Sequence, residues 1–255
     1  MYENHSGKRK DTDLIFGFRA VAEAVLSGKD IDKVLLKRGL SGDLYHETFE
    51  LLRQYEIPVQ FVPIEKINSI TRKNHQGIVA WTSPVTFYDI ENYLPQLYEQ
   101  GRMPLLLALD GITDVRNFGA IIRTAACTGV DAALIPDRGA ARVNADAVKT
   151  SAGGLLTVPI CRTADMKKSL LFLQQSGIRL IAATEKADKS YIKADFSGPA
   201  AIIMGAEDTG ISAPLLKMAD EQVAIPVFGP VQSLNVSVAA GLLMYEAVRQ
   251  RDIPR

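Results

Sequence analysis

Three stretches of the chain carry polar side chains at the points where apolar strands end or apolar helices begin. The first is residues 225–247, IPVFGPVQSLNVSVAAGLLMYEA, in which Ser233 and Asn235 follow a turn rich in glycine and proline. The small and apolar residues after them have helical spacing. Backbone N–H groups at a helix N-terminus lack intrahelical partners and can hold a polar ligand. Taken alone, this segment fits an N-capped core helix equally well.

The second stretch is residues 109–129, LDGITDVRNFGAIIRTAACTG, where a strand ends in polar residues and a helix follows. Ligands of open α/β sheets bind beyond the carboxyl ends of the strands, which is where Asn117 stands. Arg123 lies six residues further on, in an otherwise apolar helix. An arginine in this position either faces an anionic ligand or forms a surface salt bridge.

The third stretch, residues 202–210 (IIMGAEDTG), takes a buried strand into Gly205 and a carboxylate at Glu207. It resembles many nucleotide-binding loops. The chain contains neither the G-x-G-x-x-G pattern of dinucleotide-binding folds nor the G-x-x-x-x-G-K-[ST] pattern of phosphate-binding loops. A Rossmann dinucleotide site and a P-loop ATPase are therefore disfavoured.

The elements that must position these residues divide the chain into two α/β domains. Residues 13–82 contain three short strands that alternate with helices, which predicts a largely parallel sheet covered on both faces. Residues 83–103 are expected to form a linker with one helix, weakened by Pro95. Residues 104–255 contain continuous apolar runs of the kind found in buried parallel strands. The strands expected there are 105–109, 132–135, 180–183, 200–204 and 222–227.

Charge is balanced overall, with 29 basic and 29 acidic residues, so any binding to nucleic acid depends on local clusters. Between residues 116 and 149, five basic residues stand against three acidic ones. With the basic turn at residues 72–75, they form a candidate phosphate track, although the turn by itself fits a solvated surface better. The candidate RNA contacts are Arg72, Lys73, Arg116, Arg138 and Arg142.

Several classes of protein are disfavoured by what the chain lacks. Residues 1–12 indicate a disordered tail rather than a secretory signal, and no apolar run approaches the roughly 20 residues of a membrane helix. Cys127 and Cys161 have neither metal-ligand spacing nor a disulfide framework, and the three histidines are scattered. We therefore expect no metal ion, no membrane partner and a cytoplasmic location.

Taken in order, NFGAIIR, GAEDTG and IPVFGPVQSLNVSVA resemble the motifs of the SpoU/TrmH family of RNA 2′-O-ribose methyltransferases. In the first domain, GFRAVAEAVLSG and HQGIVA are similar to the subgroup that methylates a guanosine of bacterial 23S rRNA. The resemblance spans nearly the full chain. It departs from the commonest pattern at Val115, where the family often has a proline, and at Asp208, where the family often has a glycine.

The resemblance implies a SPOUT-type, trefoil-knotted α/β catalytic domain preceded by an RNA-binding domain similar to ribosomal protein L30e. It implies S-adenosylmethionine as cofactor and a homodimer whose interface includes the C-terminal helix. The implied substrate is 23S rRNA, with tRNA, or a catalytically inactive RNA-binding role, as alternatives. The family's cofactor contacts match Gly205, Ile225 and Leu234, and its functional polar residues match Asn117, Arg123, Glu207, Ser233 and Asn235.

The resemblance offers Arg123 as the group that activates the ribose hydroxyl. A guanidinium stays protonated at physiological pH and is therefore a poor base. We therefore expect Arg123 to bind the adjacent phosphate and to stabilise negative charge on the attacking oxygen. Asn117 is expected to orient the ribose, and Ser233 with Asn235 to fix the loop and the hydroxyl. Glu207 is expected to accept backbone N–H bonds.

Overall fold

The computed structural model describes residues 13–231 and 233–251, and it divides into two compact units between Ser83 and Pro84. The tail expected at residues 1–12 lies outside the described residues. The linker expected at residues 83–103 belongs instead to the second unit from Pro84 onward. Its helix α4 (Ile90–Glu99) buries three apolar side chains, and the short strand β5 (Phe87–Tyr88) before it joins the second sheet.

The first unit is a four-stranded sheet of order β1-β4-β2-β3 with helices on both faces. Only the β2–β3 pair is parallel, so the expectation of a largely parallel sheet is wrong. Helix α3 has five residues and spans about 7.5 Å. It is too short to carry the chain back along a strand, so β4 starts near the end of β3 and runs antiparallel to its neighbours. The elements are β1 (Leu14–Phe16), α1 (Phe18–Leu26), β2 (Ile31–Lys37), α2 (Asp43–Gln54), β3 (Val59–Val62), α3 (Ile64–Asn68) and β4 (Ile78–Thr82).

The second unit is a seven-stranded sheet of order β11-β9-β10-β6-β7-β8-β5, and every pair in it is parallel, as expected. The sequence patterns missed β5 and β8, because these short strands lack a continuous apolar run. They also extended β11 too far. The remaining strands are β6 (Leu105–Asp110), β7 (Ala132–Pro136), β8 (Ile160–Thr163), β9 (Arg179–Ala183), β10 (Ala200–Gly205) and β11 (Glu221–Val223).

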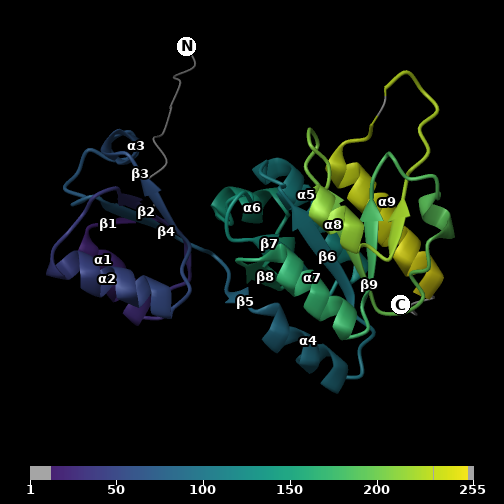
Figure 1. Cartoon of the computed structure of the whole chain (residues 1–255), viewed down its shortest axis with the longest axis horizontal. Coiled ribbons are helices and arrows are strands. Elements are labelled where there is room, and N and C mark those ends of the chain that lie inside the picture. The colour runs from purple at the N-terminus through teal and green to yellow at the C-terminus, as the bar shows by residue number, and fades with distance from the viewer. Residues whose placement is uncertain (1–12, 232, 252–255) are drawn as a thin grey trace, which may run out of the picture. The chain divides into compact units, whose positions relative to one another are not determined.

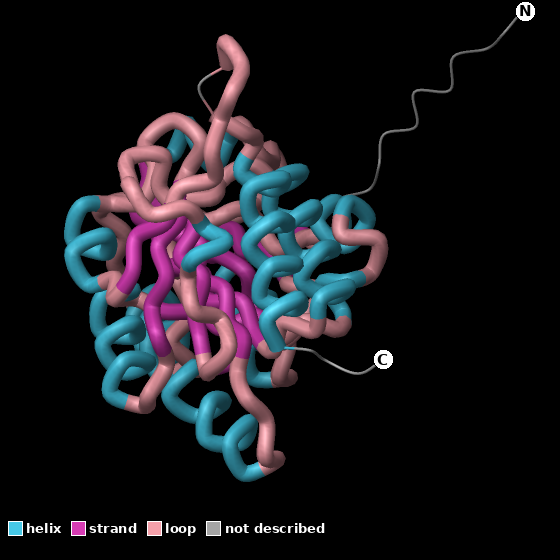
Figure 2. Tube along the Cα trace, turned by 90° about the vertical axis from the view of Figure 1, so that its right-hand side faces the viewer, coloured by secondary structure: helices cyan, strands magenta, loops and turns pink. Residues whose placement is uncertain are grey.

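Helices cover both faces of this second sheet (Figures 1 and 2). Side chains of β6 alternate between the faces: Leu105, Leu107 and Leu109 pack with α5, α6 and α9, whereas Leu106 and Ala108 pack with α4, α7 and α8. This alternation is what a strand buried on both sides requires. The helices are α5 (Val115–Thr128), α6 (Ala145–Thr150), α7 (Met166–Gln175), α8 (Ala213–Met218) and α9 (Val236–Arg251), with short 3-10 helices η1 (Gly154–Leu156) and η2 (Tyr191–Lys193).

One side chain at the end of the C-terminal helix adds hydrogen bonds to the apolar packing of this helix on the sheet. The Arg251 guanidinium donates hydrogen bonds to the carbonyl oxygens of Met103, Pro104, Phe196 and Gly198 at 2.6–3.0 Å. These carbonyls lie just before β6 and β10. Arg251 therefore ties the end of α9 to the two strands whose opposite ends carry the candidate site.

Candidate active site

The candidate site lies at the carboxyl edge of the second sheet. Strands β6 and β10 are neighbours, and Gly205 stands opposite Asp110 where both strands end. The Asp110 carboxylate accepts a hydrogen bond from the Ser212 amide at 2.8 Å, which joins the loop after β10 to the end of β6. Two of the three polar stretches therefore leave the sheet side by side, as the rule for α/β sheets predicts.

The loop after β10 folds back against the strand it leaves. A Cβ atom on Gly205 would lie 2.1 Å from the carbonyl carbon of Gly210, so only glycine fits there. Gly210 itself has φ of +66°, a conformation that favours glycine. Asp208 is not among the described non-glycine residues with positive φ, and its carboxylate accepts a bond from the Thr209 amide at 2.9 Å. The departure from glycine at position 208 therefore costs no backbone strain.

One side chain joins all three stretches. The Asn235 amide nitrogen donates to Oδ1 of Asn117 at 3.0 Å and to Oε1 of Glu207 at 2.5 Å. The same Glu207 oxygen accepts the backbone N–H of Val236 at 3.2 Å. We call Asn117, Glu207 and Asn235 the amide cluster. Its members are 118 and 28 residues apart in sequence, yet they share one hydrogen-bond network.

Two helix caps set the direction of these side chains. Asp114 is the N-cap of α5, and its carboxylate accepts bonds from the amides of Arg116 and Asn117, both at 2.8 Å. At the start of α9, Oδ1 of Asn235 accepts bonds from the amide and the hydroxyl of Ser237. The role of Asp114 was missed from the sequence, although aspartate directly before a helical pattern is a known start signal.

The cluster leaves specific polar atoms for a ligand. Both N–H donors of the Asn235 amide are engaged and its oxygen accepts two bonds, so Asn235 positions its neighbours and has little capacity for a ribose hydroxyl. Within the described residues, the Asn117 amide nitrogen and the second carboxylate oxygen of Glu207 make no hydrogen bond. The cluster therefore presents one neutral donor group and one acceptor.

Arg123 is not part of the amide cluster. Helices α5 and α9 pack together, with Thr124 facing Gly241 and the Thr128 hydroxyl 3.7 Å from the sulfur of Met244. Arg123 lies about 100° around the helix from Thr124 and is exposed. It has no hydrogen bond or ion pair within residues 13–231 and 233–251. The geometry leaves its guanidinium free to meet an anion from outside this chain.

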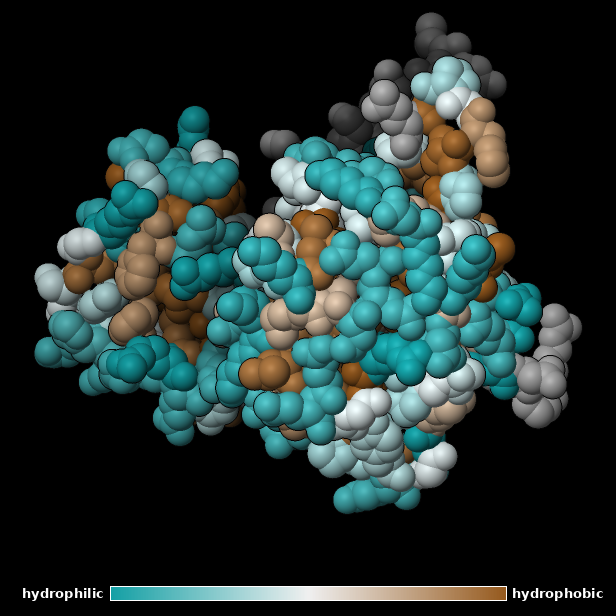
Figure 3. Space-filling view, turned by 45° about the vertical axis from the view of Figure 1, so that its right-hand side comes forward, coloured by the Kyte–Doolittle hydropathy of each residue, from teal (hydrophilic) through white to brown (hydrophobic). Residues whose placement is uncertain are grey.

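The segment from β11 to α9 projects from the second unit as an arm (Figure 1). Ile225 is half-buried at its base against the core, whereas Ser233 and Leu234 are exposed at the start of α9. Phe228 is 97% exposed and Val231 is 68% exposed, and hydrophobic side chains gather on the arm in Figure 3. Uncovered apolar side chains of this kind mark a surface that a ligand or partner covers.

The candidate RNA contacts fall into two groups, one in each unit. In the first unit, Arg72 and Lys73 are exposed, and the Lys73 ammonium lies 5.6 Å from the centre of the Phe16 ring. In the second unit, Arg116 and Arg138 are exposed and Arg142 is half-buried. The loop that carries Arg138 and Arg142 is bonded to the β6–α5 connection, because the Ala141 amide donates to the Ile112 carbonyl at 2.7 Å. The loop that bears Arg138 and Arg142 is therefore attached to the connection that leads into α5, the helix that bears Arg116.

The sequence predicts neither a metal site nor a membrane-spanning helix, and the structure bears on both predictions only for the residues it describes. Residues 13–231 and 233–251 contain no group of three or more His, Cys, Asp or Glu side chains arranged to hold a metal ion. In the same part of the chain, each helix is too short or too polar to span a membrane.

Comparison with known proteins identifies the family. The model of the SpoU rRNA Methylase family matches residues 104–245, and the model of an RNA 2′-O ribose methyltransferase substrate binding domain matches residues 14–88. The chain belongs to the SpoU family. It is thus an RNA 2′-O-ribose methyltransferase whose second unit has the SPOUT α/β fold, and the expected class of enzyme is confirmed.

Relatives of the SpoU family match over nearly the whole chain. A protein of Staphylococcus saprophyticus assigned to the TrmH family of tRNA/rRNA methyltransferases is 33% identical, over 94% of this chain and 96% of that protein. Its counterpart in Staphylococcus aureus is 35% identical, over 93% of this chain and 96% of that protein.

Two solved structures are similar as well. The SpoU methyltransferase AviRb of Streptomyces viridochromogenes, in complex with the cofactor AdoMet, is 26% identical with a TM-score of 0.60, over 94% of this chain and 90% of that chain. The TrmH/SpoU tRNA modifying enzyme of A. aeolicus is 29% identical with a TM-score of 0.55, over 64% of this chain and 84% of that chain.

Proposed function

We propose that this SpoU enzyme transfers the methyl group of S-adenosylmethionine to the ribose 2′-hydroxyl of a guanosine in 23S rRNA. The observation that carries the proposal is the bond of Asn235 to both Asn117 and Glu207, which brings three distant stretches into one site. Ribosomal RNA is favoured because the first unit matches a substrate-binding domain, whereas the similar tRNA modifying enzyme covers 64% of this chain. Guanosine as the target nucleotide rests on the resemblance of GFRAVAEAVLSG and HQGIVA alone.

The residues near the amide cluster fit the proposed cofactor. Gly205 ends β10 and is buried, Ile225 is half-buried at the base of the arm, and Leu234 is exposed directly before Asn235 of the cluster. These three residues suit a ligand that has an aromatic base and polar groups able to bond with the protein backbone. Side chains on the arm, including Phe228, are exposed and available to cover the base. S-adenosylmethionine, when bound, supplies a methyl group that is already electrophilic.

The chain's own residues must orient and activate the ribose hydroxyl. Asn117 donates to a ribose oxygen through its unengaged amide, and the second oxygen of Glu207 accepts a bond from the ligand. Fixing the oxygen in line with the methyl group is worth on the order of 7–11 kcal/mol at best. Arg123 contacts the neighbouring phosphate and stabilises charge that develops on the oxygen. Ser233, exposed beside the cluster, helps to hold the ribose.

A second copy of the chain completes the proposed enzyme. Val238, Leu242 and Tyr245 form an apolar stripe on α9, exposed by 51%, 37% and 55%. Since they recur at helical spacing on the side away from the core, they form one continuous face that we call the α9 stripe. Arg123 is exposed on α5, the helix packed beside α9. A homodimer that covers the α9 stripe therefore brings Arg123 close to the partner subunit.

Substrate RNA also contacts the first unit in this proposal. The turn that bears Arg72 and Lys73 is held in place by its neighbours: Gln76 accepts a bond from the Phe18 amide at 3.1 Å, and His75 accepts one from Gly77 at 3.0 Å. An ordered turn with exposed cations suits phosphate contacts.

We place the enzyme in the cytoplasm, where an exposed free thiol such as Cys127 stays reduced.

Methyl transfer from labelled S-adenosylmethionine to unmodified 23S rRNA, to unmodified tRNA and to no RNA tests the proposal, with mass mapping of the product. We expect label on one guanosine ribose of 23S rRNA. Asn235→Ala should abolish it, whereas Lys167→Ala, an exposed position on α7, serves as the matched control. Label on tRNA alone would show that tRNA is the substrate and 23S rRNA is not. No label on either RNA would refute the proposed methyltransferase activity.

A further inference from the structure

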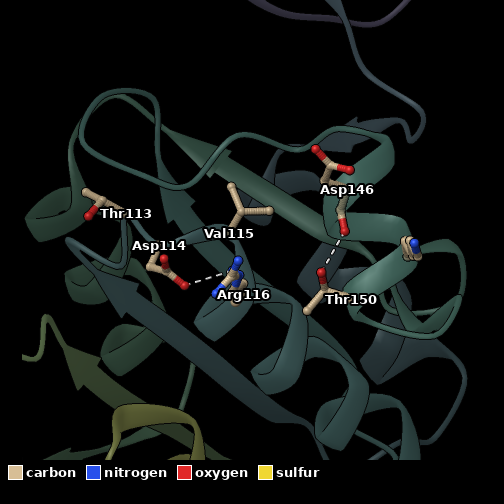
Figure 4. Close-up of a pocket in the computed structure, with 7 residues that line it drawn as sticks. Thr113, Asp114, Val115, Arg116, Asp146 and Thr150 are labelled. Carbon is tan, nitrogen blue, oxygen red and sulfur yellow. Dashed lines mark hydrogen bonds between the residues drawn. The ribbon is translucent and has the colours of Figure 1, made fainter. Parts of the chain in front are cut away.

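A cavity of about 700 Å³ lies between the start of α5 and helix α6 (Figure 4). Figure 4 shows Asp114 and Arg116 on one side of it and Asp146 and Thr150 on the other. None of the proposed cofactor contacts lines it. The lining side chains are Thr113, Asp114, Val115, Arg116, Asp146, Lys149 and Thr150.

Close helix packing fixes the walls of this cavity. A Cβ atom on Gly119 would lie 2.6 Å from the Cβ of Thr150, so the glycine lets the end of α6 approach α5. The Thr150 hydroxyl donates to the Asp146 carbonyl at 2.8 Å, and Asp114 is held by two amides as the N-cap of α5. Five of the seven lining residues therefore stand on α5 or α6, and Asp114 is the N-cap of α5.

The charges of the lining indicate the kind of ligand. Arg116 and Lys149 are cations, Asp114 and Asp146 are carboxylates, and the formal sum is zero. A simple anion would be attracted by one pair and repelled by the other. A nucleotide carries both an anionic phosphate and N–H donors on its base. Its size also suits the cavity, since small-molecule pockets measure about 300–1,000 Å³.

We propose that this cavity binds a guanosine nucleotide of the substrate RNA, one that is not the methylated nucleotide. Lys149 and Arg116 contact its phosphate, and the Asp146 carboxylate accepts the two adjacent N–H donors of guanine. Adenine and cytosine present a lone pair beside their amino group, and uracil presents one N–H between two carbonyls, so none of them matches a carboxylate. Asn117 and Arg116 are consecutive on α5 and point about 100° apart. The cavity therefore lies beside the amide cluster, not within it.

The inference rests on the proposed function, and binding of single nucleotides to the full chain tests it separately. Saturation-transfer NMR with GMP, AMP, CMP and UMP measures their relative affinities. We expect GMP to bind at least about tenfold more tightly than the others. Asp146→Asn should remove this preference, and Lys149→Ala should weaken all four nucleotides by a similar factor. Asp188→Asn and Lys167→Ala, both exposed in the same unit, are the controls.

Equal binding of the four nucleotides, or a guanine preference that survives Asp146→Asn, would overturn the inference. Loss of S-adenosylmethionine binding in Asp146→Asn or Lys149→Ala, measured by calorimetry, would overturn it too, because the cavity would then belong to the cofactor. The two failures remain distinguishable. An enzyme that methylates RNA without guanine preference in this cavity refutes only the inference, whereas guanine-specific binding without methyl transfer to any RNA refutes the proposed function.

Discussion

The side-chain amide of Asn235 lies 2.5 Å from a carboxylate oxygen of Glu207, so a neutral donor stands where the carboxylate needs one. Asn235→Asp would place a second negative charge at that distance, and two such carboxylates cannot both ionise without repulsion. We expect lower thermal stability and lower methyl transfer near neutral pH. Both should recover in part on acidification, since one carboxyl then becomes protonated and can donate. Thermal melts and initial rates between about pH 6 and pH 8 measure this.

A second substitution tests whether the contact itself is responsible. Glu207→Gln in the Asn235→Asp background restores a donor and an acceptor, so the double variant should melt at a higher temperature than Asn235→Asp alone. If the two substitutions change the melting temperature additively, Asn235 and Glu207 are not coupled in solution.

The packing of Gly205 against Gly210 gives a prediction for the loop after β10. Gly205→Ala should destabilise the second unit by at least about 1–3 kcal/mol, since its Cβ meets backbone that cannot rotate away. Gly210→Ala meets no atom within 4 Å and adds only the cost of positive φ, about 1 kcal/mol. Denaturant unfolding of the two variants measures the difference. Equal losses would mean that the loop adjusts to a side chain at position 205.

The parts of this structure that the sequence predicts are those with a local signal. Continuous apolar runs such as residues 105–109 and 200–204 mark buried parallel strands, because both faces of the sheet are covered. The short strand β8 escaped detection since Arg162 interrupts its apolar character. The direction of the strands in the first unit could not be predicted either. The alternation of strands and helices does not show that a five-residue helix is too short to return the chain to the start of a parallel strand.

The candidate site shows the same limit. The residue types of Asn117, Glu207 and Asn235 marked them as candidates, but no pattern in the sequence specifies which donor meets which acceptor. The contacts depend on the register of β6 against β10 and on the packing of α5 against α9. The cavity beside α6 was missed for a similar reason, because Lys149 and Asp146 become neighbours of Arg116 only through the close approach at Gly119.

The α9 stripe predicts how the proposed homodimer separates. Leu242→Glu puts a charge into an apolar face that a second copy covers, so it should shift the protein toward monomers and reduce methyl transfer with it. Leu171→Glu, on an exposed leucine of α7, is the matched control and should leave the oligomeric state unchanged. Sedimentation velocity measures both variants. A parent protein that is already monomeric would exclude this interface.

The two cysteines should differ sharply in reactivity. Burial, and to a smaller extent the charge of Asp89, raises the pKa of the Cys161 thiol to about 12, whereas Cys127 is exposed. The thiolate is the reactive form, so at about pH 8 Cys161 is nearly all unreactive thiol. We expect iodoacetamide to modify one cysteine per folded chain and two after denaturation, as measured by mass spectrometry. Rapid labelling of folded Cys127→Ser would contradict this.

Arg123 is exposed and has no partner within the described chain, so its role depends on the ligand. If its guanidinium holds a phosphate through two parallel bonds, Arg123→Lys keeps the charge but loses the fork. We expect methyl transfer to fall by about 10²–10³-fold in Arg123→Ala, and by less in Arg123→Lys, with cofactor affinity unchanged. Single-turnover rates and calorimetric titration separate the two effects. Near-full turnover of Arg123→Lys with an unchanged pH profile would exclude bidentate phosphate recognition, and lost cofactor binding would place Arg123 in the cofactor site instead.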